Sequence, residues 1–208
     1  MLLNRFEYHL MNNPVRAAVQ RHVEARRLLR MGGLLRGGRA LEIGCGRGVG
    51  AGIVLDQFGA GMVDAFDLDH RMVQLARRRL ARRGHRVRVW TGDASAIPAP
   101  DETYDAVFDF GVVHHILRWQ DTLAEVWRVL KPGGRLYAEE VLGDFLDHPV
   151  TRRLFRHPSH DRFDRQGFLT GLEQAGFTPV ASRETWHAMA WFVADKATHS
   201  NSTDTPPL

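Results

Sequence analysis

The sequence predicts an α/β fold, a doubly wound and mostly parallel seven-stranded sheet that ends in an antiparallel C-terminal hairpin. Two observations lead to this prediction. Short apolar runs alternate with amphipathic helical stretches through the middle of the chain, which is typical of a parallel sheet built from right-handed crossovers. Near the C-terminus, two apolar runs are joined by a link that is too short for anything but antiparallel pairing.

The N-terminal region, residues 1–36, is expected to form a helical cap or lid. Asn13 and Pro14 mark a helix start, with asparagine as the N-cap and proline at the first helical position. An apolar stripe of helical spacing then runs to a break at Gly32 and Gly33. Its members are Val15, Val19, Val23, Leu28 and Leu29.

The sheet domain is expected to occupy residues 37–197. Its predicted strands are 40–43, 62–66, 87–90, 104–110, 136–141, 178–185 and 189–194. The predicted helices run through 53–55, from Asp69 to Leu80, from 121 to 130 and from 165 to 175. Lys131 to Gly134 make a sharp turn before the fifth strand. We expect a lid insertion over 143–163 and a flexible polar tail over 198–208.

Composition narrows the class of protein. A length of 208 residues suffices for one domain with a single core. No apolar run approaches the roughly 20 residues that span a bilayer, and the N-terminus lacks the features of a signal peptide. The single cysteine, Cys45, rules out an internal disulfide and fits a reducing compartment. We therefore expect a cytoplasmic protein.

The positive charge is carried by arginine and gathers in two clusters. They comprise Arg16, Arg21, Arg26, Arg27 and Arg30, and Arg77, Arg78, Arg79, Arg82, Arg83, Arg86 and Arg88. Such clusters can attract phosphate backbones or anionic lipid, or they can simply be solvated helix faces. Aromatic residues do not alternate with these arginines, which disfavours a nucleic-acid partner. The N-terminal helix is a candidate for weak association with an anionic membrane surface.

Chemical signals follow the first three predicted strands in order. Glycines at 44, 46 and 48 follow the first strand, and they allow a tight turn and close backbone approach to a ligand. Asp67 ends the second strand, where an acidic residue can accept hydrogen bonds from ribose hydroxyls. Asp93 follows the third strand, beside Ala94. Together they predict a nucleoside-binding edge.

With these stretches the sequence resembles the class I S-adenosylmethionine-dependent methyltransferases, particularly the small-molecule group that includes quinone-biosynthesis methyltransferases. The resemblance covers roughly residues 37–142. Its motifs are Glu42 to Gly48, Asp67, Gly92 to Ala94, Tyr104 to Asp109 and Leu130 to Gly134. It implies S-adenosylmethionine as cofactor, S-adenosylhomocysteine as product and a small-molecule acceptor as partner.

The resemblance also implies roles for individual residues. Gly44 and Gly46 would contact the methionine part of the cofactor, and Asp67 and Leu68 the ribose and adenine. Asp93 and Ala94 would meet the adenine edge, and Phe110 would present backbone to the amino group. Glu42 and Cys45 belong to the same loop motif, with Cys45 interpreted as a small packing residue.

Methyl transfer requires positioning and, for hydroxyl acceptors, a base. His114 and His115 follow the fourth strand and are candidates for that base, although either could be a packing residue. The Pro-Pro motif typical of amino-group methylation is missing after Asp109, which leaves O, C or S acceptors. The alternatives are an RNA or protein methyltransferase and a non-catalytic S-adenosylmethionine-binding module.

Three further patterns are weaker. Gly46 to Ala51 also fits the Gly-x-Gly-x-x-Ala string of nicotinamide enzymes, but it starts three residues beyond the strand. A polar group suits a divalent metal in residue type but matches no familiar spacing, so no metal is predicted; it comprises Asp144, Asp147, His148, His157, His160 and Asp161. Trp119, Trp186 and Trp191 are candidates to line an apolar pocket or to pack in the core.

Overall fold

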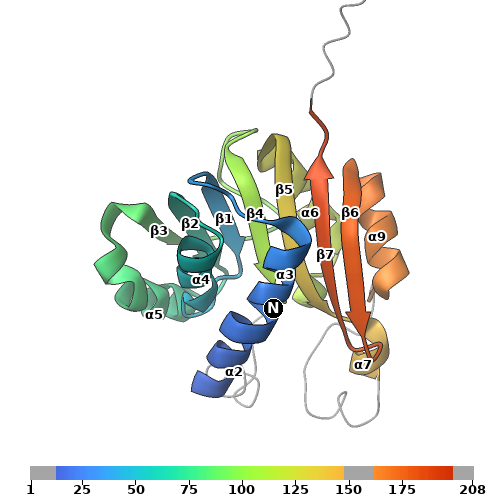
Figure 1. The fold of residues 1–208 in the computed structure, drawn as a ribbon, viewed down its shortest axis with the longest axis horizontal. Helices are drawn as coiled ribbons and strands as arrows, with labels where there is room; N and C mark the ends of the chain where they lie inside the picture. Colours follow the sequence, from blue (N-terminus) through green and yellow to red (C-terminus); the bar gives the residue numbers. More distant parts are fainter. Residues whose placement is uncertain (1–12, 148–161, 199–208) are drawn as a thin grey trace, which may run out of the picture.

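A computed structural model describes residues 13–147 and 162–198. Its centre is a seven-stranded sheet in the order β3-β2-β1-β4-β5-β7-β6 (Figure 1). The strands are β1 Arg39–Ile43, β2 Met62–Asp67, β3 Val87–Thr91, β4 Tyr104–Phe110, β5 Leu130–Val141, β6 Phe177–Thr185 and β7 Met189–Lys196. The first five pair in parallel, and β7 runs antiparallel to both of its neighbours. The predicted fold class is confirmed.

Helices cover both faces of the sheet. They are α2 Pro14–Val19, α3 Ala25–Gly32, α4 Val49–Gln57, α5 His70–Leu80, α6 Trp119–Val129, α7 Gly143–Asp147 and α9 Arg165–Gln174. The π-helical turn Gln20–Glu24 joins α2 to α3, and 3-10 turns occupy Ala81–Arg86 and Val113–His115. The predicted N-caps are confirmed, since Asn13 accepts a hydrogen bond from the Arg16 N–H and Asp69 accepts one from the Arg71 N–H.

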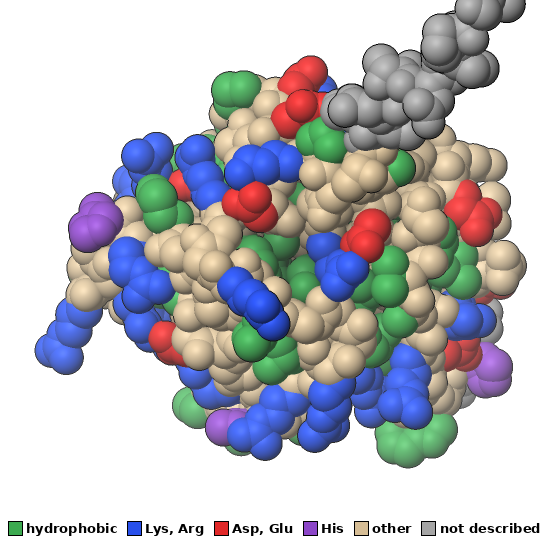
Figure 2. All heavy atoms as spheres, turned by 45° about the horizontal axis from the view of Figure 1, so that its top comes forward, with side chains coloured by type: hydrophobic (Ala, Val, Ile, Leu, Met, Phe, Trp, Pro, Cys, Tyr) green, Lys and Arg blue, Asp and Glu red, His purple; other side chains and the backbone are tan. Residues whose placement is uncertain are grey.

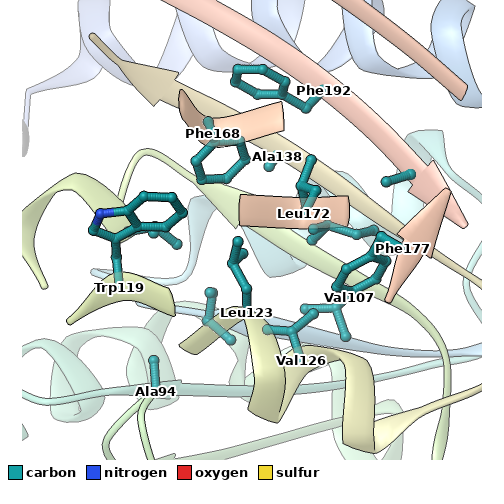
Figure 3. Packing of buried hydrophobic residues seen from close by; sticks show 14 of the residues in the cluster. Ala94, Val107, Trp119, Leu123, Val126, Ala138, Phe168, Leu172, Phe177 and Phe192 are labelled. Atoms are coloured by element: carbon teal, nitrogen blue, oxygen red, sulfur yellow. The ribbon is translucent and has the colours of Figure 1, made fainter. Parts of the chain in front are cut away.

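The core is divided by the sheet into two apolar layers. One layer packs α3, α4 and α5 against one face, and the other packs α6 and α9 against the opposite face. In the second layer, Trp119 and Leu123 of α6 meet Phe168 and Leu172 of α9 (Figure 3). The two layers hold the sheet rigid, so the loops at the carboxyl ends of its parallel strands have a fixed base.

The fifth strand is longer than the sequence indicates. Leu130 already pairs with Tyr104, and the regular register resumes only at Ala106 with Arg135. The residues between them make the predicted turn as an irregularity within β5, with Gly133 at a φ of 77°. The strand therefore begins before the turn, because the end of α6 delivers the chain directly to the sheet edge.

Candidate active site

Glycine shapes the loop that follows β1. Gly44 and Gly46 have φ values of 62° and 50°, in the left-handed region that other residues rarely adopt. A Cβ atom on Gly44 would lie 2.2 Å from a methyl carbon of Val112, whereas one on Gly46 would meet nothing within 4 Å. Gly44 is therefore packed closely against the segment after β4, while Gly46 borders space in which a ligand can approach the main chain.

Asp67 at the end of β2 braces this loop. Its Oδ2 accepts a hydrogen bond of 2.9 Å from the Gly46 N–H, and its Oδ1 accepts one of 2.8 Å from the Asp69 N–H. Burial raises the pKa of Asp67, and the two hydrogen bonds offset part of that rise. Leu68 beside it is half exposed. The tip of β2 therefore presents an anchored carboxylate next to an accessible apolar side chain.

The tip of β3 supplies Asp93 and Ala94. Asp93 is exposed, and its Oδ1 accepts hydrogen bonds from the Ser95 N–H at 2.9 Å and the Ser95 hydroxyl at 2.8 Å, which lower its pKa. Ala94 is buried beside it. Because β3 pairs with β2 and β2 with β1, the structure brings Asp93, Asp67 and the glycine loop to successive tips of one edge.

Three predicted residues lie beneath the glycine loop. Glu42 is buried in β1 and accepts a hydrogen bond from the Ala51 N–H, while its Oε2 has no partner among the described residues. Burial raises the pKa of Glu42 well above its ordinary value. Cys45 is buried and burial raises its pKa, so it stays a thiol, as its packing interpretation expects. Phe110 is buried at the end of β4.

These features fit the implied cofactor. S-adenosylmethionine carries an ammonium group with three N–H donors, and the buried Oε2 of Glu42, which has no partner among the described residues, is an acceptor that such a donor would satisfy. The open space at Gly46 suits close approach of a ligand to the backbone. The remaining lone pairs of the Asp67 carboxylate would accept hydrogen bonds from the ribose hydroxyl groups.

A second group of polar side chains is buried between β4 and the carboxyl end of β5. His114 lies in the 3-10 turn after β4, and its Nδ1 forms a short hydrogen bond to Glu140. Glu140 also accepts a hydrogen bond of 2.7 Å from the Val113 N–H and one of 3.2 Å from the His114 N–H. Asp109 accepts one of 2.9 Å from the Val112 N–H. Glu140 therefore fixes both the backbone and the ring of His114.

The protonation of this cluster follows from its burial. Asp109 and Glu140 are fully buried. Burial and the charge of Glu140 raise the pKa of Asp109 well above its ordinary value, so Asp109 is the member that keeps a proton. Burial also raises the pKa of Glu140, while hydrogen bonds from the main chain and from Asp109 lower it. The ring of His115 lies against that of His114, with the two ring centroids 4.1 Å apart.

The chain matches a family model described as a methyltransferase domain over residues 40–134. It is 37% identical over 100 residues to the fatty-acid O-methyltransferase of Mycolicibacterium smegmatis, covering 48% of this chain and 36% of that protein. It is 33% identical over 141 residues to the ubiquinone/menaquinone biosynthesis C-methyltransferase UbiE of Azotobacter vinelandii, covering 64% and 54%. A solved SAM dependent methyltransferase from Aquifex aeolicus superposes with a TM-score of 0.72 at 22% identity, covering 92% and 97%.

Residues 40–134 are thus similar to a methyltransferase domain, and the fold is shared with the solved methyltransferase. The string from Gly46 to Ala51 is therefore part of the methyltransferase loop and of α4, which begins at Val49, rather than a nicotinamide fingerprint. The chain spans no more than about half the length of the curated relatives named here.

An acidic and aromatic cluster joins the N-terminal helices to the methyltransferase domain. Glu139 is fully buried at the carboxyl end of β5, and its Oε2 accepts a 2.8 Å hydrogen bond from the Trp191 indole. Arg16 of α2 bridges Glu24 at 2.5 Å and Glu139 at 3.5 Å. Arg27 lies 4.0 Å from the centre of the Trp191 ring. These contacts hold α2 and α3 over the carboxyl end of β5.

The structure divides the predicted apolar stripe of this helix into two parts. Val15, Val19 and Val23 are exposed, with Val15 at 73%, whereas Leu28 is buried together with Glu24. The reason is the π-helical turn, whose extra residue shifts the face of the helix that meets the sheet. Arg16, which sequence reasoning placed in a surface cluster, is thereby turned toward Glu139.

The three tryptophans that the sequence offers for a pocket or the core lie in different environments. Trp119 packs against Phe163 and Phe168 with ring centroids 4.8 and 5.6 Å apart, and Trp191 is buried on Glu139. Trp186 lines no pocket, because it stands at the tip of the β6–β7 turn with 92% of its surface exposed. Trp186 and His187 both have positive φ, as the central residues of a type I′ turn require, and the Ala188 N–H closes this turn with a hydrogen bond to the Thr185 carbonyl.

Other predicted features fall outside the described residues. They include most of the 143–163 lid, the tail beyond 198, and the metal candidates His148, His157, His160 and Asp161. Among residues 13–147 and 162–198, no three histidine, cysteine or carboxylate side chains are grouped as a metal site requires. No helix in the same ranges is long and apolar enough to cross a membrane.

Sequence reasoning missed Glu140, Asp109, Glu139 and Arg16 as members of the site. The available signal was the carboxylate pair at 139–140, which ends a predicted buried strand where charged residues are costly.

Asp67→Ala is expected to weaken S-adenosylmethionine binding by about 1–3 kcal/mol, the usual cost of losing a hydrogen-bonded partner. Isothermal titration measures the change. Asp69→Ala is the matched control, because Asp69 sits two residues away but caps α5. It should cost about 1 kcal/mol of stability and leave affinity intact. Equal affinities for wild type and Asp67→Ala would exclude Asp67 from the cofactor site.

Stability is expected to fall as pH rises. Burial raises the pKa of Glu42, Asp109, Glu139 and Glu140, so the folded state binds these protons more tightly than the unfolded state. Their contribution is present at low pH and is lost as pH passes the folded-state pKa. Urea unfolding from about pH 5 to about pH 9 should show the decline, and Glu139→Gln should flatten it.

The control for this titration is Glu125→Gln. The Arg128 side chain holds the pKa of Glu125 below its ordinary value, so its linkage has the opposite sign. Glu125→Gln should leave the decline at least as steep. If Glu139→Gln and wild type lose stability in parallel, Glu139 does not carry the effect.

Proposed function

We propose that this protein transfers a methyl group from S-adenosylmethionine to an O, C or S atom of a small-molecule acceptor, with His114 as general base. The observation that carries the proposal is the buried pair of His114 and Glu140 at the carboxyl ends of β4 and β5. A carboxylate on one ring nitrogen of a histidine orients the ring and stabilises its protonated form.

The chain's own groups would work as follows. S-adenosylmethionine, when bound, supplies a methyl group on a good leaving group, so the protein needs to position the acceptor and remove its proton. In this role, the Nδ1–H of His114 donates a hydrogen bond to Glu140, and Nε2 is the basic nitrogen that takes the acceptor's proton. Asp109 keeps its own proton and donates toward Glu140, so the cluster retains one negative charge opposite the imidazolium that forms.

The acceptor class is supported by the relatives. One relative is named for O-methylation of a fatty acid and the other for C-methylation in ubiquinone/menaquinone biosynthesis, which favours an apolar acceptor. Figure 2 shows arginine and lysine side chains over much of one face, several of them close together along the lower edge of the view, with few acidic side chains among them.

The test is isothermal titration with S-adenosylmethionine, S-adenosylhomocysteine and NADH. We expect micromolar binding of the first two and none of the third. Formation of S-adenosylhomocysteine is then measured with panels of fatty acids, phenols, quinols and thiols. Binding of NADH alone would overturn the proposal. Tight cofactor binding with no turnover on any acceptor would favour a non-catalytic binding module.

A further inference from the structure

Exposed apolar side chains gather at one edge of the molecule. Nine large apolar residues are exposed among the described residues, and most of them flank the carboxyl ends of the parallel strands. Leu68 belongs to the predicted cofactor site. Four more lie at this edge, each on a different segment of the chain. We call them the apolar rim: Val15, Leu117, Phe145 and Trp186.

The fold brings the rim together from distant parts of the chain. Leu117 follows β4 and Phe145 lies in α7, directly after β5. Trp186 is at the same level, because Val141 and Thr185 both pair with Met189. Arg16 contacts Glu139 near the end of β5, which places α2 and Val15 at this edge as well. Figure 1 shows α2, α7 and the β6–β7 turn along one side of the molecule.

The charges beside the rim are arranged with cations outermost. Two ion pairs lie on the loops of this edge: Arg71 with Asp69, and Arg118 with Asp121. In both pairs the arginine is the more exposed member, and for Arg118 the values are 82% against 43% for Asp121. Arg26 and Arg30 of α3 are also exposed. A surface that approaches this edge therefore meets positive charge first.

An exposed tryptophan on a hairpin tip has a specific preference. The indole ring is apolar with one polar N–H, so it is favoured at the boundary between lipid and water. Apolar side chains among arginines suit a surface that offers negative charge outside and hydrocarbon beneath. Such a surface is an anionic lipid bilayer.

We propose that the apolar rim docks on an anionic lipid bilayer, so that the mouth of the active site faces the membrane and a lipid-soluble acceptor enters from it. The statement about the acceptor rests on the proposed function, whereas the docking itself does not. The arrangement accounts for the exposure of Trp186, which leaves 92% of the surface of this large apolar side chain accessible.

Vesicle co-sedimentation tests the docking. We expect the full chain to bind phosphatidylcholine vesicles that contain phosphatidylglycerol and to bind pure phosphatidylcholine vesicles much less. Trp186→Ser and Leu117→Ser should each lower the partition coefficient by about tenfold, as expected for withdrawing a large inserted side chain. Leu34→Ser is the matched control, because Leu34 is 58% exposed against 63% for Leu117 but precedes β1 at the opposite edge.

Fluorescence gives a second readout. Only Trp186 is exposed among the five tryptophans, so its emission should shift to shorter wavelength on anionic vesicles. Trp186→Phe should still sediment but lose the shift. The proposal is overturned if Leu34→Ser and Leu117→Ser lose binding equally, or if anionic lipid makes no difference. It is also overturned if the wild type is a dimer that the rim variants convert to monomers.

The failure of docking and that of the proposed function are separable. Rim variants should bind S-adenosylmethionine as the wild type does, because none of the four residues belongs to the predicted cofactor site. A chain that binds vesicles through the rim but fails to bind S-adenosylmethionine would contradict the proposed function and leave the docking intact.

Discussion

Gly44→Val is expected to abolish detectable binding of S-adenosylmethionine, a loss of more than about a hundredfold in affinity. The position is closed to a side chain in two ways. Its φ of 62° is unfavourable for valine, and a Cβ would lie 2.2 Å from Val112. The loop must therefore move, and with it the backbone that faces the cofactor. Isothermal titration and thermal unfolding should be measured on the same samples.

Gly59→Val is the control that separates the effect of backbone strain on stability from the effect of Gly44→Val on the cofactor site. Gly59 has a comparable φ of 74° but lies between α4 and β2, where a Cβ has a single neighbour, at 3.9 Å. It should lose similar stability and keep cofactor affinity. Gly46→Ala is a milder probe, because its methyl group enters the open space beside the loop. Wild-type affinity in folded Gly44→Val would refute the placement of the cofactor.

His114→Ala is expected to lower turnover by about 10²–10⁴-fold, the range for removal of a general base, without changing cofactor affinity. Glu140→Gln should also reduce turnover, because it removes the charge that stabilises the imidazolium while keeping the shape of the side chain. The measurement is the rate of S-adenosylhomocysteine formation with the acceptor that the panel identifies, alongside titration of the cofactor.

A pH–rate profile shows whether Glu140 changes the proton affinity of His114 or only supports the local structure. With Glu140→Gln, the acid limb of the profile should move to lower pH, since the protonated ring loses its neighbouring negative charge. His115→Ala is the matched control, because the His115 ring lies against that of His114, whereas Glu140 bonds Nδ1 of His114. A larger loss for His115→Ala than for His114→Ala would reassign the base.

The positions of Gly44, Gly46 and Asp67 at one edge of the sheet could be predicted because their signals are local. Each lies at or just after the end of a strand that the apolar pattern identifies, and parallel strands end at a common edge. The same reasoning gave the mostly parallel sheet and the terminal hairpin. The face of the sheet on which each strand residue lies could not be predicted, because it depends on how neighbouring strands are aligned with one another.

The clusters around Glu139 and Glu140 could not be predicted, because they depend on contacts between residues that are distant in the sequence. Glu140 reaches His114 across the pairing of β5 with β4, and Arg16 reaches Glu139 over 123 positions of sequence. Neighbouring residues of a strand point to opposite faces, so Glu139 and Glu140 serve different clusters. The exposure of the valines of the first helix could not be predicted for a related reason, because their regular spacing does not reveal the π-helical turn.

That turn also determines how the N-terminal helix responds to a change in length. A π-helical turn contains one residue more than an α-helical turn, so Gln20–Glu24 is equivalent to a one-residue insertion in a regular helix. Deleting one of these residues would restore an unbroken α-helix and rotate the preceding segment by about 100°. Arg16 would then leave Glu139. Related chains are therefore expected to gain or lose the extra residue together with the Arg16–Glu139 pair, as a single evolutionary unit.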